Sequence, residues 1–101
     1  MFGLREDDIA SIRHILSSYP EVRTGLIFGS RAKGNFKNGS DVDIALKGND
    51  LTFKLILKIS TELNEETLMP YHFDVLNYHT IQNEELIHHI DRIGVPFYEQ
   101  T

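Results

Sequence analysis

Three aspartates in two short segments are the residues of this chain that could perform chemistry. In residues 41–46, with the sequence DVDIAL, the two aspartates occupy alternate positions, and Val42, Ile44 and Leu46 occupy the positions between and after them. In a strand, this alternation places Asp41 and Asp43 on one face and the apolar side chains on the other. Two neighbouring carboxylates repel each other unless a positive charge neutralises them, and oxygen ligands of this kind suit Mg²⁺. Taken alone, the same pattern also fits a strand whose polar face is solvated.

The third aspartate, Asp74, lies in a second alternating segment, residues 72–76 (HFDVL). We expect Phe73 and Val75 to face the core and Asp74 to face the opposite side. Aspartate is disfavoured within strands, so an acid in each of two strand segments requires a reason. If the two strands are neighbours, the three carboxylates can surround a two-metal site, which promotes in-line phosphoryl displacement.

A turn that could hold phosphate precedes these carboxylates. Residues 25–28 (GLIF) form an apolar run typical of a buried strand, and this run stops at Gly29, where the backbone can turn sharply. Ser30 offers a hydroxyl and an N–H group at the start of a short helix, and Arg31 and Lys33 add positive charge. An ordinary strand-to-helix turn would show the same residues.

Hydrophobic periodicity predicts the elements that position these groups, and the predicted fold class is α+β. A small mixed sheet carries helices mainly on one face, and the carboxylates lie on the other, open face. The first helix ends at Tyr19-Pro20, Asn49 and Asp50 could cap the third, and Thr80 could cap the last, which stops at Gly94. The expected order is helix (6–18), strand (22–28), short helix, strand (41–47), helix (to 65), strand (71–76) and helix. Residues 95–98 are expected to pack as a short final strand or tail.

The pattern resembles the nucleotidyltransferase superfamily that includes DNA polymerase beta, and more narrowly its minimal nucleotidyltransferase (MNT) domains. The MNT signature is Gly-Ser, ten residues, then Asp-x-Asp, and here Gly29-Ser30 is followed by residues 31–40 and Asp41-Val42-Asp43. The resemblance covers nearly the whole chain and implies a single domain over residues 1–101.

The resemblance also implies roles for individual positions. The residues expected to bind the triphosphate are Gly29, Ser30, Arg31 and Lys33. The residues expected to bind metal and to act in catalysis are Asp41, Asp43 and Asp74, with Asp74 beside the attacking hydroxyl. Two Mg²⁺ ions and ATP are the implied cofactor and substrate. Lys33 stands where many relatives have arginine, which keeps the charge but loses bidentate recognition of phosphate.

Many MNT domains are encoded beside a HEPN-domain partner and act as its antitoxin, some by adding AMP to a tyrosine of that partner. The resemblance therefore implies a protein adenylyltransferase in a toxin–antitoxin pair. Two other interpretations stay open: a non-catalytic module that binds nucleotide or partner and neutralises a toxin by occlusion, and an enzyme that modifies a small molecule such as an antibiotic. Whether the chain forms an oligomer is also left open.

Composition narrows the classes of partner. The length of 101 residues suits one domain with a modest core. Ten basic and fifteen acidic residues give a net charge of −5, which argues against an extended nucleic-acid surface. The absence of cysteine excludes disulfides and thiolate metal sites. No apolar run reaches membrane-spanning length and no signal peptide is recognisable, so the cytoplasm is the expected location.

Overall fold

The structure, a computed structural model, describes residues 1–100 and confirms the α+β fold class. Its elements, in chain order, are α1 (Glu6–Ser17), β1 (Thr24–Phe28), α2 (Gly29–Lys33), β2 (Val42–Lys47), α3 (Phe53–Glu65), β3 (Phe73–Asn77), the short 3₁₀ helix η1 (Tyr78–Thr80), α4 (Glu84–Ile93) and β4 (Val95–Glu99). All the predicted helices and strands are present, and the segment after Gly94 is a fourth strand.

The strands form one mixed sheet in the order β3-β2-β1-β4. β1 is antiparallel to both of its neighbours, β2 and β4, whereas β2 and β3 run parallel. The carboxyl end of β1 therefore meets the amino ends of β2 and β3 at one end of the sheet. This end carries Gly29, which follows β1, and the two segments that contain the aspartates. The topology thus collects the predicted site residues at a single end of the sheet.

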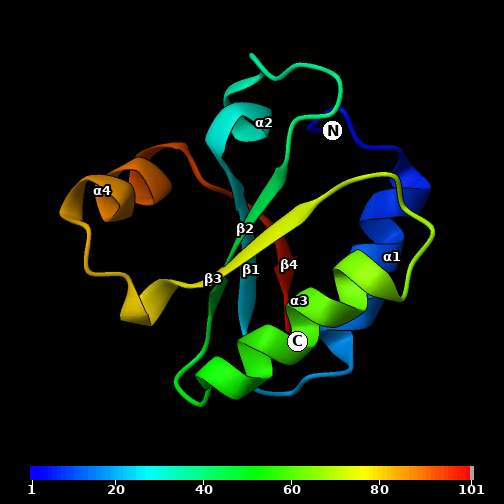
Figure 1. Ribbon diagram of the computed structural model, residues 1–101. Helices are drawn as coiled ribbons and strands as arrows, with labels where there is room; N and C mark the ends of the chain where they lie inside the picture. The colour runs from blue at the N-terminus through cyan, green and yellow to red at the C-terminus, as the bar shows by residue number, and fades with distance from the viewer. Residues whose placement is uncertain (101) are drawn as a thin grey trace.

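Helices cover both faces of the sheet. Figure 1 shows α1 and α3 together on one side and α4 on the other, with α2 at the end where β1 stops. The larger core lies under α1 and α3, and the smaller core lies under α4 and contains Leu26, Phe28, Ala45 and Ile90. α4 therefore packs on the face that carries Asp43, which the sequence analysis expected to be open. The reason is that β1 and β2 are apolar on both faces at their centre, and an apolar face must be covered.

Two helix starts differ from the predicted ones. α3 is capped by Thr52, whose hydroxyl accepts a hydrogen bond from the Leu55 N–H at 3.1 Å, and not by the asparagine and aspartate before it. α4 is capped by Asn83, whose side chain accepts from the Leu86 N–H at 3.2 Å, because Thr80 is already part of η1. The predicted end of the last helix at Gly94 is confirmed.

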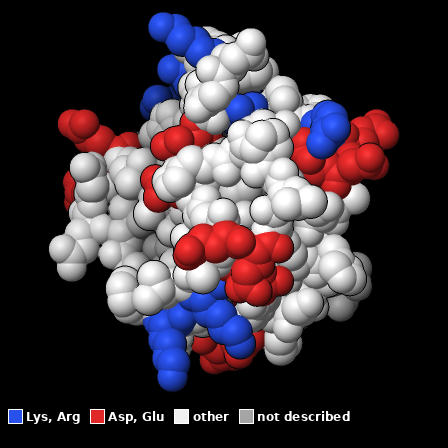
Figure 2. All heavy atoms as spheres, turned by 45° about the vertical axis from the view of Figure 1, so that its right-hand side comes forward, with Lys and Arg blue, Asp and Glu red and all other residues white. Residues whose placement is uncertain are grey.

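The charged surface is divided into small groups. On the face shown in Figure 2, acidic side chains form several separate clusters, and basic side chains gather mainly at the upper and lower ends. The longest helix in the described part of the chain, α3, has 13 residues, and none of the helices there is long and apolar enough to cross a membrane.

Candidate functional site

Asp43 and Asp74 lie side by side on neighbouring strands. They are paired in the register of β2 and β3, and adjacent strands are about 4.8 Å apart. Both side chains leave the sheet on the face opposite the larger core. Phe73 and Val75 are buried in that larger core, as predicted. The structure therefore brings two of the three predicted carboxylates together.

Asp41 lies one residue before β2 begins, at the margin of this pair. Its Oδ1 atom is 3.5 Å from Nδ1 of His72, and both side chains are more than half exposed, at 56% for Asp41 and 67% for His72. His72 was not among the predicted site residues. The available signal was its position, two residues before Asp74 in the same alternating segment.

Asp43 is the carboxylate whose environment is most perturbed. Burial, followed by the negative charges of Asp74 and Asp41, raises the pKa of Asp43 from 3.8 to about 6, and the positive charges of Arg31 and His72 oppose this rise only in part. A carboxyl group in this position is destabilised when it is ionised. A bound cation would relieve that repulsion, so the electrostatics of the site favour positive charge beside Asp43.

The turn that follows β1 is in contact with the same carboxylate. Gly29 has a φ angle of +73°, a conformation that side-chain-bearing residues rarely adopt. A Cβ atom added at Gly29 would overlap the Asp43 carboxylate. This follows from the register, in which Phe28 pairs with Asp43 across β1 and β2. Glycine is therefore required here both for the backbone angle and for the close approach of Asp43.

His89 completes the contacts of this turn, and the sequence analysis did not identify it. The Gly29 N–H donates a hydrogen bond to Nε2 of His89 at 3.1 Å. The imidazole ring also stands edge-on to the Phe28 ring, with their centroids 6.1 Å apart. The signal was the helical spacing of Leu86, His89 and Ile90, which places the histidine on the packed face of α4.

The remaining predicted phosphate-binding residues lie on α2. Ser30 is half-buried at its first turn, and its carbonyl accepts a hydrogen bond from the Gly34 N–H at 3.0 Å. Lys33 is exposed at its last residue. Both residues are at the end of the sheet where the aspartates lie.

Arg31, also on α2, is buried, and its guanidinium is engaged with the backbone. Nε and Nη2 donate to the Ser40 carbonyl at 3.2 and 2.9 Å, and Nη1 donates to the Phe2 carbonyl at 2.9 Å. The guanidinium also lies over the rings of Phe36 and Tyr71, at 5.0 and 5.3 Å from their centroids. Arg31 thus anchors the loop that leads to Asp41 and acts on the carboxylates through its charge.

The donor set fits a hard cation such as Mg²⁺. Its candidate ligands are carboxylate oxygens, which Mg²⁺ prefers. Within residues 1–100, no three His, Asp or Glu side chains lie close enough together to hold an ion by themselves. Mg²⁺ in nucleotide sites is usually bound by one or two carboxylates, with substrate phosphates and water supplying the other ligands. The pair formed by Asp43 and Asp74 matches that arrangement.

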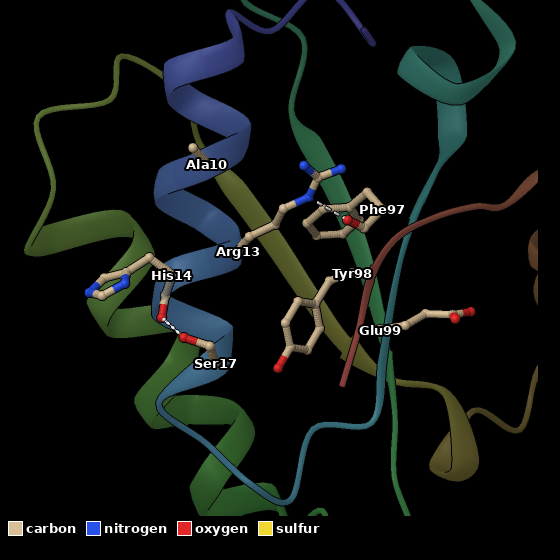
Figure 3. A pocket seen from close by; sticks show the side chains of 7 residues that line it. All are labelled: Ala10, Arg13, His14, Ser17, Phe97, Tyr98 and Glu99. Atoms are coloured by element: carbon tan, nitrogen blue, oxygen red, sulfur yellow. Dashed lines mark hydrogen bonds between the residues drawn. The ribbon is translucent and has the colours of Figure 1, made fainter. Parts of the chain in front are cut away.

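A separate groove of about 490 Å³ lies between α1 and β4 (Figure 3). Two of its lining residues are joined by a hydrogen bond, in which Nε of Arg13 donates to the Phe97 carbonyl at 2.6 Å, and Tyr98 lies beside this contact. None of the predicted site residues lines this groove. The predicted site residues therefore lie apart from this groove, at the end of the sheet near α2.

Comparison with known families identifies the class of protein. The family described as polymerase beta, nucleotidyltransferase matches residues 10–101, and the chain belongs to this family. No curated protein matches the chain.

Solved structures share the fold. A crystal structure of a toxin–antitoxin with AMP-PNP aligns with a TM-score of 0.74 at 19% identity, covering 97% of this chain and 76% of the other. The toxin–antitoxin MntA-HepT aligns with a TM-score of 0.72 at 16% identity, covering 95% and 74%. A crystal structure from Sulfolobus solfataricus, described as that of a nucleotidyltransferase, aligns with a TM-score of 0.52 at 21% identity, covering 97% of this chain and 92% of the other.

Proposed function

We propose that this chain is a nucleotidyltransferase that transfers AMP from ATP to a hydroxyl of a HEPN-type toxin and is the antitoxin of that pair. The observation that carries the proposal is the position of Asp43. It is partly buried, paired with Asp74, approached by Asp41, and in contact with the glycine turn that opens α2. A phosphate-binding turn beside clustered carboxylates is the arrangement that nucleotidyl transfer requires.

Roles follow from the positions in the site. Asp43 and Asp74, with Asp41 at their margin and substrate phosphates as further ligands, would hold Mg²⁺, which supplies Lewis-acid stabilisation of the charge on the reacting phosphate. Backbone N–H and hydroxyl groups at Ser30 would contact the triphosphate, and Lys33 would add a positive charge from the surface of α2.

In the proposed reaction, the acceptor oxygen forms a bond to the α-phosphorus, and the bond between that phosphorus and the bridging oxygen to the β-phosphate breaks. Pyrophosphate leaves with the bonding electrons. The hydroxyl proton passes to a carboxylate beside the acceptor, for which Asp74, the exposed member of the strand pair, is the proposed base. The products are the adenylylated acceptor and pyrophosphate.

Two considerations support a protein acceptor. The structural relatives include toxin–antitoxin complexes, one of them with AMP-PNP. The carboxylate pair lies at one end of the sheet, where Asp74 is exposed, so that a large acceptor can reach it. An acceptor that brings its own docking surface suits this site.

The test is transfer of label from ATP labelled at the α-phosphate. The chain and a co-expressed HEPN partner are incubated with Mg²⁺ and labelled ATP, beside the Asp43→Asn variant and an Asp50→Asn control. Asp50 is an exposed aspartate before α3. We expect label on the partner with the native chain and the control, and a loss of at least about a hundredfold with Asp43→Asn. Circular dichroism checks that the variant is folded.

Retained transfer by a folded Asp43→Asn protein would refute the proposed mechanism. If no label is transferred, while the native chain and the Asp43→Asn variant bind and neutralise the partner equally, neutralisation proceeds by occlusion without chemistry.

A further inference from the structure

A side chain from α4 holds the turn that opens α2. The N–H of Gly29 donates to Nε2 of His89, a contact between residues 60 positions apart. This N–H group is the first in the segment that the proposed function assigns to the triphosphate, so its direction influences the orientation of the groups after it. The inference below rests on that proposed function.

The position of His89 is itself determined by packing. Its neighbour Ile90 is buried against Leu26, Phe28 and Ala45, and Leu86 packs against the same cluster. The His89 ring is half-buried and stands edge-on to Phe28. The residue before the turn and the histidine that binds the turn are therefore in contact with each other. α4 thus presents an acceptor, held in place by packing, to the backbone N–H of the glycine turn.

The turn needs such an anchor because of its glycine. Gly29 adopts a φ angle of +73°, and glycine has more accessible backbone conformations than any other residue. A cross-chain hydrogen bond selects one of them. Since misplacement of a binding group by about 1 Å can reduce rates about a hundredfold, an anchor at this point has consequences for the reaction.

We propose that His89 is a positioning residue for nucleotide binding: its Nε2 atom fixes the Gly29–Ser30 turn in the orientation that receives the triphosphate. The role requires an unprotonated Nε2, so the imidazole carries its proton on Nδ1. In this proposal, the Nε2 atom of His89 contributes to nucleotide binding as a hydrogen-bond acceptor, in addition to what the ring contributes by packing.

Two substitutions at this position separate the acceptor from the ring. In His89→Gln, the side-chain oxygen can occupy the place of Nε2 and keep the hydrogen bond. In His89→Asn, the acceptor is closer to the backbone, at the place of Nδ1, and cannot reach Gly29. His88→Asn is the matched control because His88 is the exposed neighbour on the same helix.

The measurements are the dissociation constant for ATP with Mg²⁺ by calorimetry, amide hydrogen exchange at Gly29 by NMR, and thermal unfolding. We expect His89→Asn to weaken ATP binding about tenfold and to expose the Gly29 amide to exchange, while His89→Gln and His88→Asn remain near the native values. A role in packing alone would lower the melting temperature of both variants at position 89 and give no rescue by glutamine.

Equal ATP affinity in His89→Asn and the native chain would overturn the inference and leave the proposed function standing. Equal loss in the glutamine and asparagine variants would also overturn it. If the native chain binds no ATP, the proposed function fails and the positioning role for nucleotide fails with it. Gly29 exchange in the same samples then shows separately whether His89 holds the turn.

Discussion

Asp43 destabilises the folded protein at neutral pH. Its carboxyl group is partly buried beside two other aspartates, and its pKa is raised to about 6. The carboxyl group of Asp43 binds its proton more tightly in the folded protein than in the unfolded chain. This proton binding stabilises the folded state fully below pH 3.8, and the stabilisation is lost as the pH rises through about 6. Residues that lower stability in this way are often retained for function.

Removing the charge of Asp43 is therefore expected to stabilise the protein. Asp43→Asn should raise the free energy of unfolding at pH 7.5 by about 1 kcal/mol, a value reduced from the full effect of the pKa change because the site is partly open to solvent. The gain should shrink towards zero as the pH falls below about 4. Urea denaturation of the variant and of Asp50→Asn at several pH values provides the check, and a gain independent of pH would contradict the stated cause.

Gly29 and Gly34 form a matched pair for testing the glycine turn. Both have positive φ angles, +73° and +84°, but only an added Cβ at Gly29 would meet the Asp43 carboxylate, whereas Gly34 has open space. We expect Gly34→Ala to cost about 1 kcal/mol for the backbone angle alone, and Gly29→Ala to cost about 3 kcal/mol or more. Chemical denaturation measures both, and equal costs would show that the contact with Asp43 can relax freely.

Alternation along the chain was sufficient to predict which residues face the site. The period of two placed Asp43 and Asp74 opposite the larger core because the residues next to them, Phe73 among them, are apolar and buried there. The structural roles of Arg31 and His89 were not predictable in the same way. Arg31 binds carbonyls of Phe2 and Ser40, and His89 binds Gly29, so both depend on long-range contacts that no local pattern encodes.

At the level of elements, one side chain fixes the position of α3 against β3. The carboxamide of Asn64 accepts from the Phe73 N–H at 2.7 Å and donates to the Phe73 carbonyl at 2.9 Å. The carboxamide thus makes the two backbone hydrogen bonds that a neighbouring strand would make at Phe73, the first residue of β3. Asp74 is the next residue, so this contact holds the backbone directly beside the second carboxylate segment.

Loss of this side chain should destabilise the fold. Asn64→Ala leaves the N–H and carbonyl groups of the buried residue Phe73 without their partner, and we expect a cost of about 2 kcal/mol. Asn49→Ala, at an exposed position before α3, should change stability by less than about 0.5 kcal/mol. Denaturant midpoints measure both, and an unchanged midpoint for Asn64→Ala would show that water replaces the carboxamide without loss.

Element types were predicted more accurately than their boundaries and their packing. Thr52 and Asn83 cap their helices although other capping residues stand nearby, because the residue with extended backbone just before the first turn provides the cap. The position of α4 on the carboxylate face depends on the second apolar face of β1, which alternation does not reveal in a continuously apolar strand.

For the whole molecule, the negative net charge disfavours nucleic acid as a partner. The value of −5 and the separate groups of basic side chains in Figure 2 offer no continuous track for a phosphate backbone on that face. We expect no binding to duplex DNA tighter than about 0.1 mM at physiological salt. Fluorescence anisotropy with a labelled duplex tests this, with a basic DNA-binding domain as the positive control. A micromolar dissociation constant would contradict it.

The two outer strands of the sheet share a property that limits how the protein can associate. On β3, Asn64 already occupies the backbone of Phe73; on β4, Pro96 has no N–H to offer and the Phe97 carbonyl already accepts from Arg13. A sheet with interrupted borders is a poor template for fibril growth. A partner that extended the sheet would have to displace these groups first, so recognition through side chains and helix surfaces is the less costly route.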